Sequence, residues 1–166
     1  MDDIGKKAEG KIKEWLDRPE DGYSFDRIPD QMSGQFGSKN ICDFACYRYP
    51  FMYYIESKAT WNDRWEFNQL TETQYDGLLE KSKIYGCYGL VIVLFASYQR
   101  AFVFKIEDID DYTKKTGKKS LNVTKIAKWS IPYKEIATIP NNRKKLLDYS
   151  GELEEYIGVE MLWNVM

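Results

Sequence analysis

Histidine is absent from the 166 residues of the chain. Its absence excludes a histidine general base, a histidine metal ligand and a Ser-His-Asp arrangement. Cysteine is scarce, and without histidine the thiols of Cys42, Cys46 and Cys87 cannot complete a four-ligand structural zinc site within one chain. Their odd number, together with a charged N-terminus (MDDIGKKAEG) that lacks an export signal, predicts reduced thiols and a cytoplasmic protein.

The chain also lacks a strong charge of one sign and a long apolar run. Its formal net charge is -2, so no global basic field indicates a nucleic-acid ligand. The longest uncharged stretch, residues 84–99, is short for a membrane span and is interrupted by Gly86 and Gly89. This stretch favours a buried strand, and we expect no membrane association.

Aromatic residues are plentiful, at 16% of the chain, and most of them are expected in the core. Trp61 and Trp65 lie in the polar run 59–69 and are predicted to be exposed. The three cysteines are predicted to be ordinary core residues.

Spacing of apolar residues predicts both helices and strands. Ile4, Ala8 and Ile12 recur at helical spacing, and Pro19 ends that segment. We expect helices at 2–17, 71–85 and near 143–157, and strands at 22–28, 41–47, 51–58, 88–96 and 98–106. A turn at 48–50 makes a hairpin of the second and third strands. This order predicts one α/β (α+β) domain over residues 1–166, with a mixed central β-sheet flanked by helices.

Charged residues end an otherwise apolar strand in the stretch YYIESKATWN, residues 53–62. Side chains alternate between the two faces of a strand, so Glu56 and Lys58 share one face. Asp43 interrupts a second apolar strand, ICDFACY, and the hairpin brings it to the same end of the sheet. Two close carboxylates repel unless a cation such as Mg²⁺ or Mn²⁺ joins them. With a lysine that stabilises a developing phosphorane charge, the set predicts phosphodiester hydrolysis without histidine.

The spacing Asp43–x12–Glu56–x–Lys58 resembles that of the PD-(D/E)xK nuclease superfamily. More specifically, the succession GKKAEGKI, DF, IESKAT, TETQYDGLL and GLVIVLF resembles the RecU-type Holliday-junction resolvases of Gram-positive bacteria and their phages. The resemblance covers roughly residues 5–140. It implies a restriction-endonuclease-like fold.

The resemblance also implies a role for each matching residue. Asp43 and Glu56 would hold Mg²⁺, for which Mn²⁺ substitutes, and the main-chain carbonyl of Ser57 would be a third ligand. Lys58 would orient water or stabilise the transition state; taken alone, it would form only a solvated strand-end pair with Glu56. The implied substrate is branched DNA, and two matched cuts in a two-fold symmetric four-way junction imply a homodimer.

Two further positions fit the resemblance but also have ordinary explanations. Glu9 matches an acidic residue on the family's first helix that would act through metal-bound water, or it is a surface charge paired with Lys6 or Lys13. Gln74 matches a glutamine that would place Lys58 or the scissile phosphate. Because Thr71-x-x-Gln74 is also the signature of a capping box, both roles remain open.

Local clusters of cations must attract DNA, because the whole chain does not. The residues predicted to contact DNA are Arg27, Lys39, Lys114, Lys115, Lys118 and Lys119, with Lys125 and Lys128 in the same run. That run, 113–130, holds six lysines and no acid, although a solvated face is the usual role of such a run. The cluster at 143–145 is a weaker candidate. Where the family carries a basic stalk, this chain has the glycine-containing loop 29–40, which is expected to enter the junction's open centre.

The function that accounts for most of these residues is a metal-dependent, structure-selective endonuclease that resolves four-way junctions in recombination and repair. A duplex or flap endonuclease of restriction or repair type would use the same fold and the same residues. A junction-binding protein without catalysis is the alternative of another class, although such a protein has no need to concentrate acids near phosphate.

Overall fold

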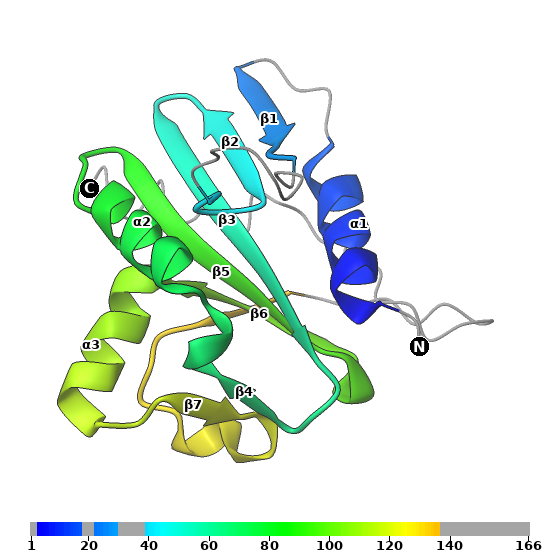
Figure 1. Cartoon of the computed structure of the whole chain (residues 1–166), viewed down its shortest axis with the longest axis vertical. Helices are drawn as coiled ribbons and strands as arrows, with labels where there is room; N and C mark the ends of the chain where they lie inside the picture. Colours follow the sequence, from blue (N-terminus) through cyan, green and yellow to red (C-terminus); the bar gives the residue numbers. More distant parts are fainter. Residues whose placement is uncertain (1–2, 18–21, 30–38, 137–166) are drawn as a thin grey trace.

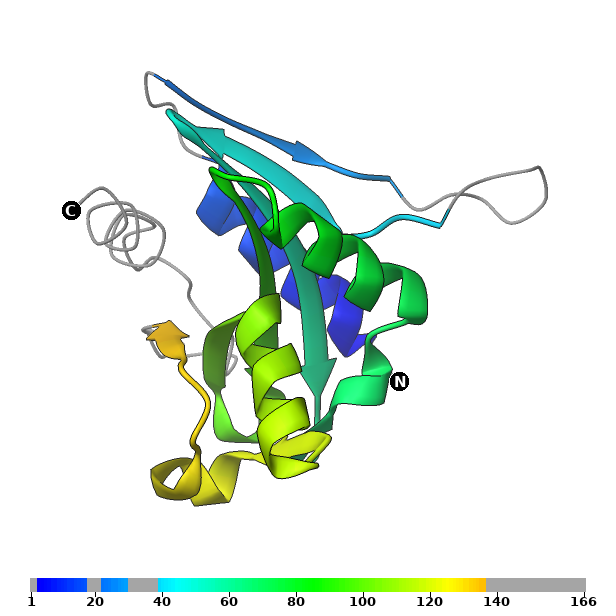
Figure 2. The ribbon, with the colours of Figure 1, turned by 90° about the vertical axis from the view of Figure 1, so that its left-hand side faces the viewer.

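Six strands form one mixed sheet that separates two layers of helices (Figures 1 and 2). The computed structural model describes residues 3–17, 22–29 and 39–136. The strands lie in the order β1 (Tyr23–Arg27), β2 (Phe44–Arg48), β3 (Phe51–Thr60), β5 (Cys87–Phe95), β6 (Arg100–Lys105) and β8 (Lys134–Ile136). Helix α1 (Ile4–Leu16) covers one face, and helices α2 (Glu72–Ser82) and α3 (Ile106–Thr116) cover the other.

Helix α1 forms where the sequence predicts a helix. Asp3 caps its start, because the Asp3 carboxylate accepts hydrogen bonds from the main-chain N–H groups of Gly5 and Lys6. Its buried side chains, Ala8, Ile12 and Leu16, recur every four residues and pack on the sheet. The opposite face of α1 is therefore left to charged residues.

The central strands are paired as a mixed sheet. Strands β2 and β3 form the predicted antiparallel hairpin, whereas β3 and β5 are parallel, and β5 and β6 are antiparallel. Because β3 and β5 are parallel, the chain must cross back between them, and α2 lies in that crossover. Strand β5 is buried from Gly89 to Phe95, as its apolar sequence predicts. The predicted fold class, an α+β domain with a mixed central sheet flanked by helices, is confirmed.

Two glycines let α2 lie unusually close to its neighbours. A Cβ atom at Gly89 of β5 would stand 2.7 Å from the carbonyl oxygen of Leu78 on α2. A Cβ atom at Gly77 of α2 would collide with the side chain of Ile41, in the segment that leads into β2. Helix α2 is thereby held close to the sheet and to the start of β2.

A second, smaller sheet is made of β4 (Arg64–Glu66) and β7 (Ser120–Asn122), and the 3₁₀ helices are η1 (Phe67–Gln69), η2 (Ala96–Tyr98) and η3 (Val123–Lys128). The prediction that Trp65 is exposed is wrong, because this side chain is fully buried and stacks on Phe104 of β6. Its neighbours on β4 are polar, but strand alternation turns Trp65 alone toward the core. Trp61 is exposed, as predicted.

Helix α3 is an element that the sequence analysis missed. Ile106, Ile109 and Tyr112 are buried at helical spacing, and the acidic stretch 107–111 and the first two lysines of the run belong to the same helix. The predicted helix near 143–157 and most of the loop 29–40 lie outside the described residues. Among the described helices, none is long and apolar enough to span a membrane.

Candidate active site

Strand β3 extends past its pairing with the first residue of β2, and Asp43 lies immediately before that residue. The last residue pair of the hairpin is Phe44 with Ile55, so Asp43 immediately precedes β2, whereas the sequence placed it within that strand. Its main-chain N–H still donates to the carbonyl of Ile55, at 3.1 Å. The side chain then turns back, and Asp43 Oδ2 accepts a hydrogen bond of 2.8 Å from the N–H of Ser57. The aspartate is thus fixed at the open edge of β3.

The main-chain carbonyl of Ser57 points to the same edge. In an antiparallel pair, the N–H and C=O of one residue point to the same neighbouring strand, and residues two apart point the same way. The carbonyl of Ile55 faces the β2 side, because it accepts the bond from Asp43, so that of Ser57 faces this side as well. The pairing of β2 does not extend past Ile55, so no strand within the described residues pairs with Ser57 on that edge. The predicted third ligand therefore lies beside the Asp43 carboxylate.

Glu56 is a buried carboxyl group with one satisfied and one unsatisfied oxygen. Its side chain is 2% exposed, and Oε1 accepts from Gln74 Nε2 at 2.7 Å and pairs with Lys58 Nζ at 2.8 Å. Oε2 is buried and has no hydrogen-bond partner among the described residues. The pKa of Glu56 is raised to about 7, first by burial and then by the charge of Asp43, while Lys58 opposes the shift and Glu9 adds to it.

Gln74 makes contacts that fit both of its predicted roles at once. It is the third residue of α2, and its main-chain N–H donates to Thr71 Oγ1 at 3.2 Å while its Oε1 accepts from the Thr71 N–H at 3.0 Å. This is a complete capping box. The same Oε1 accepts from Lys58 Nζ at 3.1 Å, and Nε2 donates to Glu56. One amide thus starts the helix and holds the acid and the lysine in a fixed arrangement.

Glu9 belongs to α1, on the other face of the sheet from α2. Its Oε2 pairs with Arg27 Nη2 at 2.6 Å, so its partner in the described chain is Arg27, whereas the sequence-based alternative was Lys6 or Lys13. The charge of Glu9 also contributes to the raised pKa of Glu56, which places the two carboxylates in one electrostatic environment. Sequence spacing carried no signal for the ion pair, because Arg27 is on β1, eighteen residues from Glu9.

The other predicted cations differ in how much of their charge is already paired. Lys114 and Lys115 pair with Asp110 at 2.6 Å and with Asp111 at 3.8 Å, on their own helix. The charges of these two lysines are therefore opposed by acids of the preceding stretch, because α3 contains both. Lys118, Lys119, Lys125 and Lys128 are exposed and form no ion pair with a described residue, and Lys39 is exposed as well.

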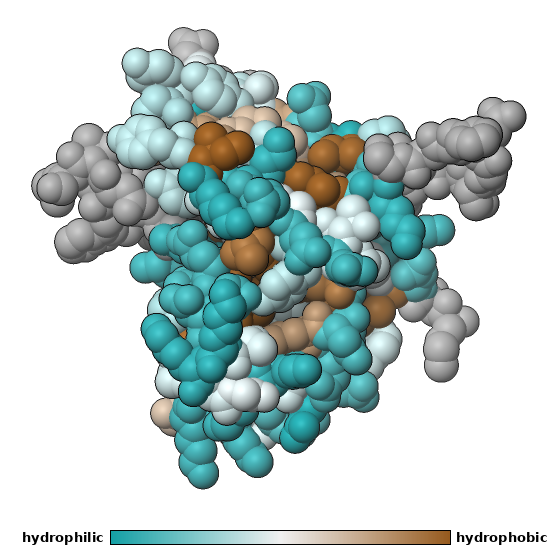
Figure 3. All heavy atoms as spheres, turned by 60° about the vertical axis from the view of Figure 1, so that its left-hand side comes forward, coloured by the Kyte–Doolittle hydropathy of each residue, from teal (hydrophilic) through white to brown (hydrophobic). Residues whose placement is uncertain are grey.

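Lys118 and Lys119 are linked to the site through the main chain. They lie between α3 and β7, and the carbonyl of Lys119 accepts from the N–H of Phe67 at 2.9 Å. Phe67 begins η1, which leads to Thr71 and the start of α2. Figure 3 shows hydrophilic side chains covering the lower part of the molecule, where Figure 1 places α3 and β7.

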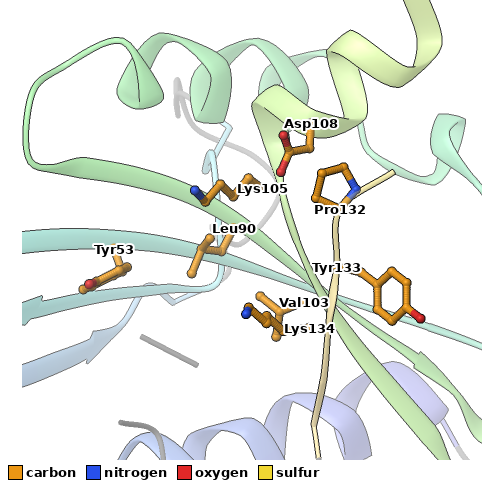
Figure 4. A pocket seen from close by; sticks show the side chains of 8 residues that line it. All are labelled: Tyr53, Leu90, Val103, Lys105, Asp108, Pro132, Tyr133 and Lys134. Carbon is orange, nitrogen blue, oxygen red and sulfur yellow. The ribbon is translucent and has the colours of Figure 1, made fainter. Parts of the chain in front are cut away.

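A small pocket of about 60 Å³ lies elsewhere, against β3, β5, β6 and the segment before β8 (Figure 4). Tyr53, Lys105 and Tyr133 are among its lining residues, and none of the predicted catalytic residues is.

The structure brings Asp43, Glu56, Ser57, Lys58 and Gln74 together, with Glu9 nearby. Within the described residues, no three aspartate, glutamate, histidine or cysteine side chains form a cluster that could hold a metal. Any ion would have to rely on two carboxylates and the main chain.

Comparison with known proteins identifies the family of the chain. No curated protein matches the chain. Among solved structures, the chain is similar to the Holliday junction resolvase Hjc of the archaeal hyperthermophile Archaeoglobus fulgidus, with 16% sequence identity and a TM-score of 0.41 over 62% of this chain and 77% of that chain.

A family model described as RecU, Recombination protein U, matches residues 24–154. The matched range is most of the chain and contains Asp43, Glu56, Lys58 and Gln74, whereas Glu9 precedes it. The chain therefore belongs to the RecU (Recombination protein U) family, and this membership supports the Holliday-junction resolvase function that its sequence predicts.

Proposed function

We propose that the protein is a metal-dependent endonuclease that resolves four-way DNA junctions in recombination and repair, with Asp43, Glu56 and Lys58 as its catalytic residues. The observation that carries the proposal is the buried Glu56 carboxyl, whose pKa is raised to about 7 and whose Oε2 lacks a hydrogen-bond partner among the described residues. A structural acid in a core would be fully paired. An acid left half-satisfied beside a second carboxylate fits a site that receives a cation.

The donor set suits a hard cation. Asp43, Glu56 and the carbonyl of Ser57 offer oxygen ligands, which Mg²⁺ prefers and Mn²⁺ also accepts, and Glu9 would act indirectly, through water. Mg²⁺, when bound, would neutralise the charge of these carboxylates and of the phosphate and would activate the attacking water. The incomplete side-chain cluster fits Mg²⁺, because this ion usually takes only one or two protein carboxylates and completes its shell with water and phosphate oxygens.

The residues of the chain have separate tasks in this scheme. Asp43 is oriented by the Ser57 N–H, so its other carboxylate oxygen keeps one direction. Lys58 is 18% exposed and is held by Gln74 and Glu56, which leaves its ammonium group ready to stabilise negative charge that develops on the scissile phosphate. Gln74 is a positioning residue, since it acts through Lys58 and Glu56. Arg27, Lys39, Lys118 and Lys119 would bind phosphates away from the chemistry.

The same proposal includes a homodimer, because resolution of a four-way junction requires two matched cuts related by two-fold symmetry. A duplex or flap endonuclease on the same residues is the second candidate. It is favoured by one difference between this sequence and the family, because the loop 29–40 stands where the family carries a basic stalk.

The decisive experiment is incubation of the full chain with labelled four-way junction, flap and linear duplex, with Mg²⁺ or with EDTA. We expect symmetric cleavage of the junction that requires Mg²⁺. Asp43→Asn should abolish cleavage and leave junction binding intact or stronger, since it removes a negative charge near phosphate. Cleavage in EDTA would refute metal dependence, preference for flap or duplex would favour the second candidate, and binding without any cleavage would favour the non-catalytic alternative.

A further inference from the structure

Two exposed aromatic side chains lie at one end of the central strand pair. Trp61 follows the last residue of β3 and is 59% exposed, and Tyr98, in η2 after β5, is 43% exposed. The two turns that carry them touch, because Ser97 Oγ donates a hydrogen bond of 2.7 Å to the carbonyl oxygen of Trp61. Figure 1 shows both turns at the same end of the sheet. Two large aromatic side chains are thus exposed to solvent at this end of the sheet.

The turn that carries Trp61 is held in place on both sides. The N–H of Asn62 donates to Thr60 Oγ1 at 3.1 Å. The carbonyl of Asp63 accepts from the N–H of Val123 at 2.8 Å, and the Asp63 carboxylate accepts from Asn122 Nδ2 at 2.9 Å. The exposure of Trp61 is therefore not that of a loose loop. A ring presented on a fixed backbone loses little conformational freedom when it binds a ligand.

Trp61 is also close to the candidate active site along the chain. It lies three residues after Lys58, so the two Cα atoms are at most about 11 Å apart, at about 3.3–3.6 Å per residue. Successive nucleotides of one B-form strand are about 3.4 Å apart along the helix axis, so this span corresponds to about three nucleotides along that axis. DNA whose phosphate lies at Lys58 would bring a neighbouring nucleotide within reach of the Trp61 ring.

We propose that Trp61 stacks on a base that is unstacked at the branch point of the DNA, and thereby favours branched over linear substrates. Bases within a continuous duplex have both faces covered by their neighbours, so only an unstacked base offers a free face to an indole ring. This inference rests on the proposed function, since it takes Lys58 as the place of the scissile phosphate. Tyr98, on the adjoining turn, is a second exposed aromatic side chain at this end of the sheet.

The test compares the binding of a four-way junction and a linear duplex, in EDTA, by wild type, Trp61→Ala, Trp61→Phe and Tyr85→Ala. Tyr85 is the matched control, because it is 94% exposed and lies before β5, at the opposite end of the sheet. We expect Trp61→Ala to weaken junction binding about tenfold and duplex binding less than twofold. Trp61→Phe should retain most of the preference, and Tyr85→Ala should behave as wild type.

An unchanged junction preference in Trp61→Ala, or an equal loss for both DNAs, would overturn the inference. A second measurement does not depend on how that variant folds. Junction DNA, and not duplex, should quench the part of the tryptophan fluorescence that Trp61→Phe removes, and equal quenching by both would also overturn it. Cleavage by wild type with Mg²⁺ is measured in parallel. No cleavage of any DNA refutes the proposed function, whereas cleavage of the junction with an unchanged preference in Trp61→Ala refutes only the stacking.

Discussion

Glu56 occupies a position where ionisation of its carboxyl group is unfavourable. Burial and the charge of Asp43 raise its pKa from 4.5 to about 7, so folding favours the protonated form. Such a group stabilises the fold fully below pH 4.5, and this contribution is lost as the pH rises to about 7. A cation at the site would reverse the preference, because it favours the charged carboxylate. Without a bound cation, the ionised Glu56 carboxylate therefore lowers the stability of the fold, and a bound cation would offset that cost.

The pH dependence of unfolding tests this account of Glu56. In EDTA, the contribution of Glu56 to the free energy of unfolding, seen as the difference between wild type and Glu56→Gln, should fall by about 3 kcal/mol between about pH 4.5 and 7 and level off above. Glu56→Gln should remove most of that slope. The absence of histidine makes the measurement clean, since no histidine titrates in this range. Urea denaturation at a series of pH values checks it, and parallel curves for wild type and Glu56→Gln would contradict the raised pKa.

Lys58 should matter for the rate and little for the fold. Lys58→Ala is expected to lower the cleavage rate by about two orders of magnitude or more, as for the removal of one electrostatic stabiliser of a transition state. Lys83→Ala is the matched control, because Lys83 is 62% exposed and pairs with Glu80 at the surface. Single-turnover cleavage and thermal unfolding are the measurements. A near-normal rate in Lys58→Ala would mean that the Glu56–Lys58 contact is an ordinary ion pair without a catalytic role.

At the scale of the elements, the position of α2 depends on the absence of a side chain at Gly89. An alanine Cβ would stand 2.7 Å from the Leu78 carbonyl oxygen and 2.9 Å from Ile106 Cγ2, so the helix would have to shift. We expect Gly89→Ala to lower stability by about 1–3 kcal/mol. Because α2 carries Gln74, cleavage should slow as well.

Gly10→Ala is the control for that substitution, since a Cβ at Gly10 meets nothing within 4 Å and alanine favours the middle of a helix. It should leave stability unchanged or raised. Urea denaturation and cleavage rates of the two variants are compared side by side. Wild-type stability in Gly89→Ala would show that the helix is not held as closely as described.

The elements also show what sequence could and could not predict. The hairpin and the buried strand β5 were predictable, because alternation and apolar runs are local signals. Helix α3 was missed because it begins at Ile106, directly after β6, and its N-cap residue, Lys105, forms no side-chain cap bond. At the site, the spacing of Asp43, Glu56 and Lys58 was enough to predict their convergence. The pair of Glu9 with Arg27 was not predictable, because only the folded sheet brings α1 and β1 together.

At the scale of the whole molecule, a chain of net charge -2 must present its cations locally to bind DNA. Lys118 and Lys119 are good candidates, since they are exposed, form no ion pair within the described residues and are joined to η1, before α2, through the Lys119 carbonyl. Neutralising both to Gln should weaken binding of all DNA structures alike. It should also lower the slope of log K against log salt by roughly one unit for each phosphate that is no longer neutralised.

The matched control neutralises Lys114 and Lys115, whose charges are already opposed by Asp110 and Asp111 on α3. We expect a smaller change in the salt slope for that pair. Binding isotherms at several salt concentrations provide the measurement. Equal slopes for wild type and the Lys118/Lys119 variant would mean that DNA takes another path across the surface.

The dual use of Gln74 restricts how this position can change. A capping box accepts either glutamine or glutamate, so Gln74→Glu would preserve the start of α2. It would also place a third carboxylate against Glu56 Oε1, which now accepts from the Gln74 amide at 2.7 Å. A small residue would avoid the repulsion but would lose the bond from the Thr71 N–H to Gln74 Oε1, which is the side-chain half of the capping box. Of the two residues that complete a capping box here, the site therefore tolerates one, so a change in the chemistry of this position also weakens the start of the helix.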